Sequence, residues 1–130
     1  MFRYNSYHKV ITACIFVAWA IFHFNSRNTN SLYYENGQIK REGITKNSLN
    51  HGIWTWYHEN GNVFIQGEFI QGEREGVWKR FDQNGNLVQE SIYIKNKLNG
   101  EFIIYEPEKG IVEKHYYEDD KLIKKQVINQ

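Results

Sequence analysis

Aromatic and aliphatic residues recur at a fixed distance between residues 33 and 122, with polar residues and glycine between them. Equivalent positions are 24 residues apart. They are Tyr33, Tyr57, Phe81 and Tyr105; Trp54, Trp78 and Phe102; Phe69, Tyr93 and Tyr117; Gly52, Gly76 and Gly100; Gly37, Gly61 and Gly85; and Ile39, Val63 and Leu87. A period of this size indicates an array of similar structural units.

Each 24-residue unit predicts a β-hairpin and a return turn. Asn-Gly stands in the middle of the unit, as in Asn60-Gly61, and it favours a hairpin turn while breaking a helix. The flanking segments are rich in aromatic and β-branched residues, which are typical of strands. We therefore expect an all-β fold: a single-layer antiparallel meander of 24-residue β-hairpin repeats, preceded by one N-terminal hydrophobic helix.

The Asn-Gly turn also predicts how the strands pair. If residues 58–61 form a type I turn with Gly61 in the left-handed region, followed by a bulge, Tyr57 faces Val63 across the hairpin. Phe81 then faces Leu87, and Tyr33 faces Ile39, which matches the repeating positions. The turn glycines are Gly37, Gly61, Gly85 and, one residue late, Gly110.

Continued along the strands, this register assigns side chains to two faces, each partly apolar and partly charged. One face is expected to carry Ile53, Tyr57, Val63, Ile65, Phe69, Val77, Phe81, Leu87 and Tyr93. The other is expected to carry Trp54, Trp56, Phe64, Ile70, Trp78, Val88, Ile92 and Ile94. The final segment, residues 121–130, lacks the Trp and Gly positions, and it reads as a lysine-rich edge strand that blocks further pairing.

The N-terminal segment has a different composition. No charged residue occurs between Lys9 and Arg27, and the 17 residues between them would form a helix of about 25 Å. Such a helix is short for a membrane span, but flanking basic side chains can extend it. We therefore divide the chain into residues 1–27, a signal-anchor or transmembrane segment that contacts the membrane through residues 10–26, and a repeat domain, residues 28–130.

Other readings of this segment remain open. A cleaved signal peptide would use Ala18-Trp19-Ala20 as its cleavage site and leave the repeat domain secreted or periplasmic. A lipoprotein signal at Cys14, or a buried soluble helix, would also account for the apolar residues. With an uncleaved anchor, we expect a single-pass membrane protein whose repeat domain is extracytoplasmic, because Arg3 and Lys9 favour the inner side for the N-terminus.

Charge and candidate chemistry exclude several function classes. Residues 31–130 carry 13 basic and 15 acidic residues without a basic stripe, which argues against nucleic-acid binding. The five histidines are not at metal-ligand spacing, and the glycines follow the hairpin period rather than a phosphate loop. The acids Glu68, Glu73 and Glu75 read as solvated turn residues. We predict no enzyme activity, catalytic residue, cofactor or metal.

The tryptophan positions allow two interpretations. Trp54, Trp56, Trp78 and Phe102 could form a spine, meaning a row of packed rings that holds neighbouring hairpins together. They could instead form a platform that binds a glycan or a peptide. Because the row follows the structural period, we favour the spine, with Trp78 buried between Trp54 and Phe102.

The repeats resemble the MORN-repeat variant, and in particular the bacterial YwqK-like family of toxin–antitoxin antitoxins. The resemblance is carried by "HGIWTWYHENGNVFIQGEFIQGEREG" at 51–76, "GVWKRFDQNGNLVQESIYIKNKLNG" at 76–100 and "GEFIIYEPEKGIVEKHYYEDDKL" at 100–122, and by the half unit at 33–43. It implies a string of β-hairpins and a non-catalytic interaction surface whose partner is a protein, either a toxin or a secreted effector. An envelope module for glycan or lipid head groups and a structural spacer are the alternatives.

Overall fold

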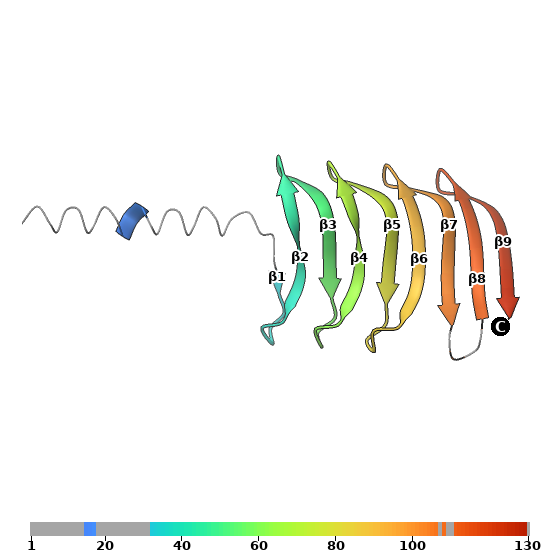
Figure 1. Cartoon of the computed structure of the whole chain (residues 1–130), viewed down its shortest axis with the longest axis horizontal. Coiled ribbons are helices and arrows are strands. Elements are labelled where there is room, and N and C mark those ends of the chain that lie inside the picture. Colours follow the sequence, from blue (N-terminus) through green and yellow to red (C-terminus); the bar gives the residue numbers. More distant parts are fainter. Residues whose placement is uncertain (1–14, 18–31, 107, 109–110, 130) are drawn as a thin grey trace, which may run out of the picture.

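The computed structural model describes residues 15–17, 32–106, 108 and 111–129. Residues 32–129 form one antiparallel sheet of nine strands in the order β1 to β9, and Figure 1 shows them side by side in chain order. The strands are β1 (Leu32–Tyr33), β2 (Ile39–Lys46), β3 (Leu49–Tyr57), β4 (Val63–Ile70), β5 (Glu73–Phe81), β6 (Leu87–Ile94), β7 (Lys97–Glu106), β8 (Ile111–Glu118) and β9 (Lys121–Asn129). The expected all-β meander of hairpin repeats is confirmed.

The expected N-terminal helix lies mostly outside the described residues. Only residues 15–17 are described there, and they are helical. Within the described parts of the chain, no helix is long and apolar enough to cross a membrane. The turn near Pro107 that contains Gly110 also falls outside the described residues.

The Asn-Gly turns have the expected register. In the second unit, the His58 N–H donates to the carbonyl of Asn62 at 2.8 Å, and Tyr57 pairs with Val63. Gly61 has a φ of 88°, a region that a residue with a Cβ adopts only under strain. The same pairing joins Tyr33 to Ile39 and Phe81 to Leu87.

The return turns are of a second kind. Both central residues have positive φ, as a type I′ turn requires: Asn47 and Ser48, Gln71 and Gly72, Lys95 and Asn96, and Asp119 and Asp120. Successive return turns are tied together, because the N–H of Gly72 donates to the carbonyl of Asn50 and that of Asn96 to the carbonyl of Arg74. The two turn types therefore alternate along the chain, with the Asn-Gly turns at one end of the strands and the return turns at the other.

The predicted division into faces is wrong for several residues. After Tyr57 and Val63 the pairing shifts by one residue, so Trp56 faces Ile65 and Trp54 faces Gly67. A shift of one residue moves side chains to the opposite face. Ile65 and Phe69 consequently lie on the same face as Trp54 and Trp56. The same shift between Arg80 and Phe81 places Tyr93 on the face of Trp78.

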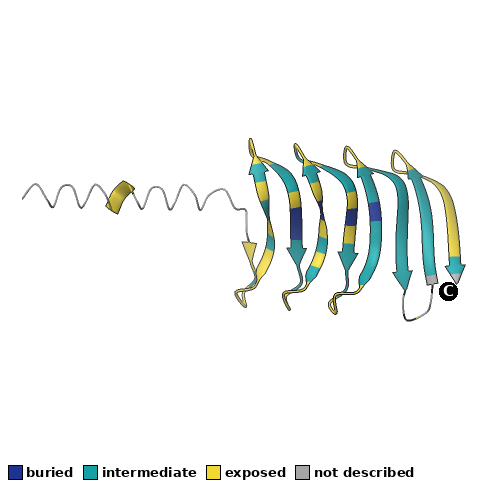
Figure 2. Cartoon of the chain, viewed as in Figure 1, coloured by how far each residue is buried: buried dark blue, intermediate teal, exposed yellow. Residues whose placement is uncertain are grey.

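We call the side that carries Trp54, Trp56, Phe69, Trp78 and Tyr93 the aromatic face. Its side chains are buried or partly buried, whereas the opposite face of β2 to β5 is mostly exposed. Trp54 and Trp78 are the buried apolar residues of the described chain, with 1% and 5% of their surface exposed. Figure 2 shows the buried positions in the middle of the strands and the exposed positions at the turns.

Each tryptophan ring lies flat against a glycine of the preceding strand. A Cβ at Gly43 would overlap the ring of Trp54, and a Cβ at Gly67 would overlap the ring of Trp78. In the next unit Ser91 occupies the glycine position, is only 3% exposed, and faces the smaller ring of Phe102. The missing side chain thus makes room for the ring that joins one hairpin to the next.

This packing predicts a coupled effect of two substitutions. Gly67→Ala should lower the free energy of unfolding by about 1–3 kcal/mol in a denaturant titration, because the added methyl group displaces the indole. In a Trp78→Leu background the same substitution should cost much less, because the ring is gone. Ser91→Ala, which adds no atom at the equivalent position, is the control. Equal costs of Gly67→Ala in the two backgrounds would contradict the packing.

Candidate interaction surface

The rings of the aromatic face form a continuous cluster. Phe69 lies edge-on to Trp54 and to Trp78, with centroid distances of 6.3 and 5.0 Å. Trp56 contacts Trp54 at 5.8 Å and Trp78 at 5.9 Å. Trp78 is therefore surrounded by Trp56, Phe69 and Tyr93, and not by Trp54 and Phe102 as the sequence spacing had suggested.

Burial separates the four predicted residues into two groups. Trp54 and Trp78 are buried among rings and strand backbone, which is the position of a spine. Trp56 and Phe102 are partly exposed. Trp54 also donates its indole N–H to the carbonyl of Ile44 at 2.9 Å, whereas the indole nitrogen of Trp78 is buried without a partner. Trp56 is thus the tryptophan of this cluster that a ligand can reach.

Three arginines lie beside these rings. Arg41 pairs with Trp56 across β2 and β3, and Arg80 pairs with Ile65 across β4 and β5. The guanidinium carbon of Arg74 lies 3.9 Å from the ring centroid of Tyr93, and its Nε donates to the side-chain oxygen of Asn96 at 3.2 Å. Sequence reasoning missed the arginines because only apolar side chains were assigned to the two faces. Alternation along β5 already puts Arg80 on the face of Trp78, whereas Arg41 is placed by the pairing of β2 with β3.

Towards the C-terminal strands, β7 and β8, the tryptophans of the aromatic face are replaced by smaller rings. Phe102 stacks on His115 at 5.9 Å, and His115 occupies the column of Gly43, Gly67 and Ser91. The carboxylate of Glu113 contacts Lys125 and His115 at 3.0 and 3.2 Å, and these contacts hold the pKa of Glu113 below its ordinary value. The tryptophan cluster is consequently confined to the first half of the array.

The opposite face combines exposed aliphatic side chains with ion pairs. Ile44, Ile53 and Val77 are about half exposed there. Lys79 contacts Glu90 at 3.3 Å, and the Tyr105 hydroxyl donates to the same carboxylate at 2.6 Å. The hydrogen bond from Tyr105 lowers the pKa of Glu90, and in return it raises the pKa of Tyr105 to about 12.

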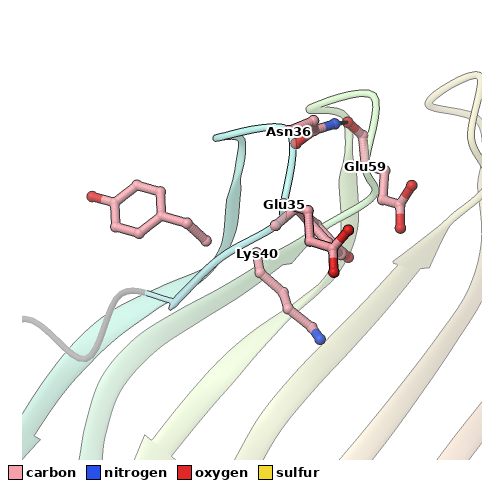
Figure 3. A pocket seen from close by; sticks show the side chains of 6 residues that line it. Glu35, Asn36, Lys40 and Glu59 are labelled. Atoms are coloured by element: carbon pink, nitrogen blue, oxygen red, sulfur yellow. Dashed lines mark hydrogen bonds between the residues drawn. The ribbon is translucent and has the colours of Figure 1, made fainter.

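A shallow pocket of about 490 Å³ lies at the first two Asn-Gly turns (Figure 3). Its lining includes the exposed side chains of Glu35, Lys40 and Glu59. Asn36 closes one side by donating to the carbonyl of Glu59 at 3.0 Å. The same type of bond joins Asn60 to Gln83 at 2.7 Å, so this hydrogen bond belongs to the repeating structure.

Two of the polar residues considered for chemistry, His58 and Glu75, have structural partners, whereas Nδ1 of His51 is buried without one. His58 contacts the carbonyl of Phe81 at 3.0 Å, as Tyr34 does the carbonyl of Tyr57 at 2.7 Å one unit earlier. Glu75 accepts a hydrogen bond from the N–H of Lys95 at 2.9 Å. Within the described ranges, no three His, Cys, Asp or Glu side chains are grouped so that they could hold a metal ion.

Comparison with known proteins supports the repeat. The family model of the MORN repeat variant matches residues 29–47, 50–71 and 74–95. These three matches correspond to successive hairpin units, and together they contain Trp54, Trp56 and Trp78. No curated protein matches the chain. The chain therefore contains repeats similar to the MORN repeat variant.

The Tyr105–Glu90 pair predicts a pH dependence. Because the pKa of Tyr105 is raised from 10.0 to about 12 in the folded state, the pair with ionised Glu90 stabilises the fold fully at neutral pH and up to pH 10, and this stabilisation is lost as the pH rises towards 12. Ultraviolet titration of wild-type protein against Tyr105→Phe should isolate a tyrosine that ionises near pH 12. Glu90→Gln should lower that pKa towards 10. An unchanged pKa in Glu90→Gln would contradict the assignment.

Proposed function

We propose that this chain is a non-catalytic, membrane-anchored repeat protein whose aromatic face presents a rigid β surface to a protein partner. The single observation that carries the proposal is the position of Trp56. It lies partly exposed between two buried tryptophans and next to Arg41. Tryptophan and arginine are enriched among the residues that contribute most to binding between proteins.

The rigidity of this surface favours binding with little loss of conformational entropy. The rings rest on strand backbone, and hydrogen bonds join the turns of successive units at both ends of the strands. A partner therefore meets side chains that are already held in place. The His58 ring and the side chains of Asn36 and Asn60 are held by structural bonds of this kind, which supports a role in binding.

The resemblance to YwqK-like proteins suggests the kind of partner. In an antitoxin, the surface would bind and neutralise a toxin. An N-terminal anchor at residues 10–26 would instead place the repeats at the membrane, on the extracytoplasmic side, where a secreted effector is the corresponding partner. The charge-free run between Lys9 and Arg27 supports the anchor.

Partner binding through Trp56 can be separated from stability. Trp56→Ala should abolish capture of the partner protein by the full chain, and it should change the melting temperature far less than Trp78→Ala does. Removing the buried Trp78 ring should cost about 3–5 kcal/mol. Affinity capture with mass spectrometry and thermal unfolding should be measured on both variants. Unchanged capture of the partner by Trp56→Ala would show that the binding site does not include Trp56. Capture of glycan by the chain would favour an envelope ligand-binding module.

The anchor predicts how the chain fractionates. The intact chain should stay in the membrane fraction after a carbonate wash, because an apolar helix in the bilayer is not released by high pH. Replacing two residues of the apolar run, as in Val17→Lys together with Ile21→Lys, should release it. A mature protein that begins at Ile21 would show that the segment is a cleaved signal peptide.

A further inference from the structure

Charges of opposite sign are separated between the two faces of β2 to β6. Following the pairing from strand to strand, the charged residues of the aromatic face are Arg41, Arg74 and Arg80. On the opposite face of the same strands the register places five carboxylates and three lysines, namely Glu42, Glu68, Glu73, Glu75, Glu90, Lys40, Lys46 and Lys79. In β2 to β6 the aromatic face is thus purely basic, and the opposite face is predominantly acidic.

The charges of two arginines, Arg41 and Arg80, are not paired within the described part of the chain. Within the described part of the chain, no ion pair joins Arg41 or Arg80 to a carboxylate, and the Nε atom of each is buried without a hydrogen-bond partner. A ligand cannot reach these buried Nε atoms, so a carboxylate would bind the terminal nitrogens of the guanidinium, which suit it through two parallel hydrogen bonds. The structure therefore leaves two cationic groups that an anionic ligand would satisfy.

These two arginines and the exposed tryptophan lie in one row across the sheet. The pairing runs from Arg41 to Trp56, from Trp56 to Ile65 and from Ile65 to Arg80. The two arginines are three strand spacings apart, or about 14 Å. An extended peptide advances about 3.4 Å per residue, so carboxylates four residues apart span about the same distance.

We propose that the aromatic face binds an acidic peptide segment of the partner, with carboxylates on Arg41 and Arg80 and an apolar side chain between them on Trp56 and Ile65. This inference rests on the proposed function and specifies the chemistry of its partner. The segment lies across the strands, along the row. Its acidic groups are attracted by the arginines, and the carboxylates of the opposite face lie on the other side of the sheet.

An anionic lipid surface would need a different arrangement of charge. Headgroup binding relies on clusters of protruding basic side chains. Here the arginines are partly buried beside rings, and the exposed lysines of these strands, Lys40, Lys46 and Lys79, lie on the opposite face with the acids. The observed placement fits an inserted peptide better than a membrane.

The test is selection of a displayed random library of 12-residue peptides on the full chain. We expect enrichment of peptides with two Asp or Glu residues four apart and an apolar residue between them. Fluorescence anisotropy of a selected peptide should then show at least about tenfold weaker binding to Arg41→Gln/Arg80→Gln, a loss typical of a broken charge pair. The matched control, Lys46→Gln/Lys79→Gln, removes the same charge from the opposite face and should bind as the parent does.

Several outcomes would overturn the inference. Selected peptides without acidic residues, no enrichment at all, or equal binding to both double variants would each do so. Binding to vesicles of phosphatidylserine and phosphatidylcholine that is lost in Arg41→Gln/Arg80→Gln, without peptide enrichment, would assign the surface to a membrane instead. If non-acidic peptides are selected and their binding is lost in Trp56→Ala, the proposed function stands and only the acidic partner is wrong.

Discussion

The packing of an indole ring on a glycine is the constraint on which the rest of this sheet depends. A single-layer sheet has no second layer to cover its side chains, so its apolar surface must be buried against its own strands. Trp54 and Trp78 achieve this by lying over Gly43 and Gly67, where a methyl group would already collide with the ring. Each ring thereby covers backbone of the neighbouring strand, and adjacent hairpins are held in one relative position.

Hydrogen bonds between successive turns, at both ends of the strands, reinforce the coupling between hairpins. The ring packing stops towards the C-terminal strands. Side chains of the Asn-Gly turns donate to carbonyls one unit later, as Asn36 does to Glu59, while the return turns are linked through backbone N–H groups such as that of Gly72. Stability in such an array arises mainly between neighbours. At the C-terminal end His115 fills the glycine position and β9 carries Gln126 where β3 and β5 carry tryptophan, so the interlocking ring is absent from the last described strand.

The same alternation that builds the sheet gives its faces different chemistry. The large rings need a small residue, glycine or serine, on the neighbouring strand. In β2 to β6 the charged residues on the aromatic face are arginines, whose planar groups can stack on rings as Arg74 does on Tyr93. The carboxylates are collected on the other face, where Glu90 accepts from Tyr105 and pairs with Lys79. A face whose charged residues all have one sign thus results from the register, without any departure from the repeat in β2 to β6.

The sequence by itself determined the hairpin units, their order and the pairing next to each Asn-Gly turn, because a 24-residue period and the left-handed glycine are local properties. It also identified Trp54, Trp56 and Trp78 as the residues to examine. It did not place Phe69 and Tyr93 with them or reveal Arg41 and Arg80 beside them. The placement of Phe69 and Tyr93 was decided by a one-residue shift between Trp56 and Tyr57, repeated at Arg80 and Phe81, and that of Arg41 by the pairing of β2 with β3. The glycine under each ring comes from the pairing of β2 with β3 and of β4 with β5, and the energetic advantage of this packing exists only once the neighbouring strand is in place.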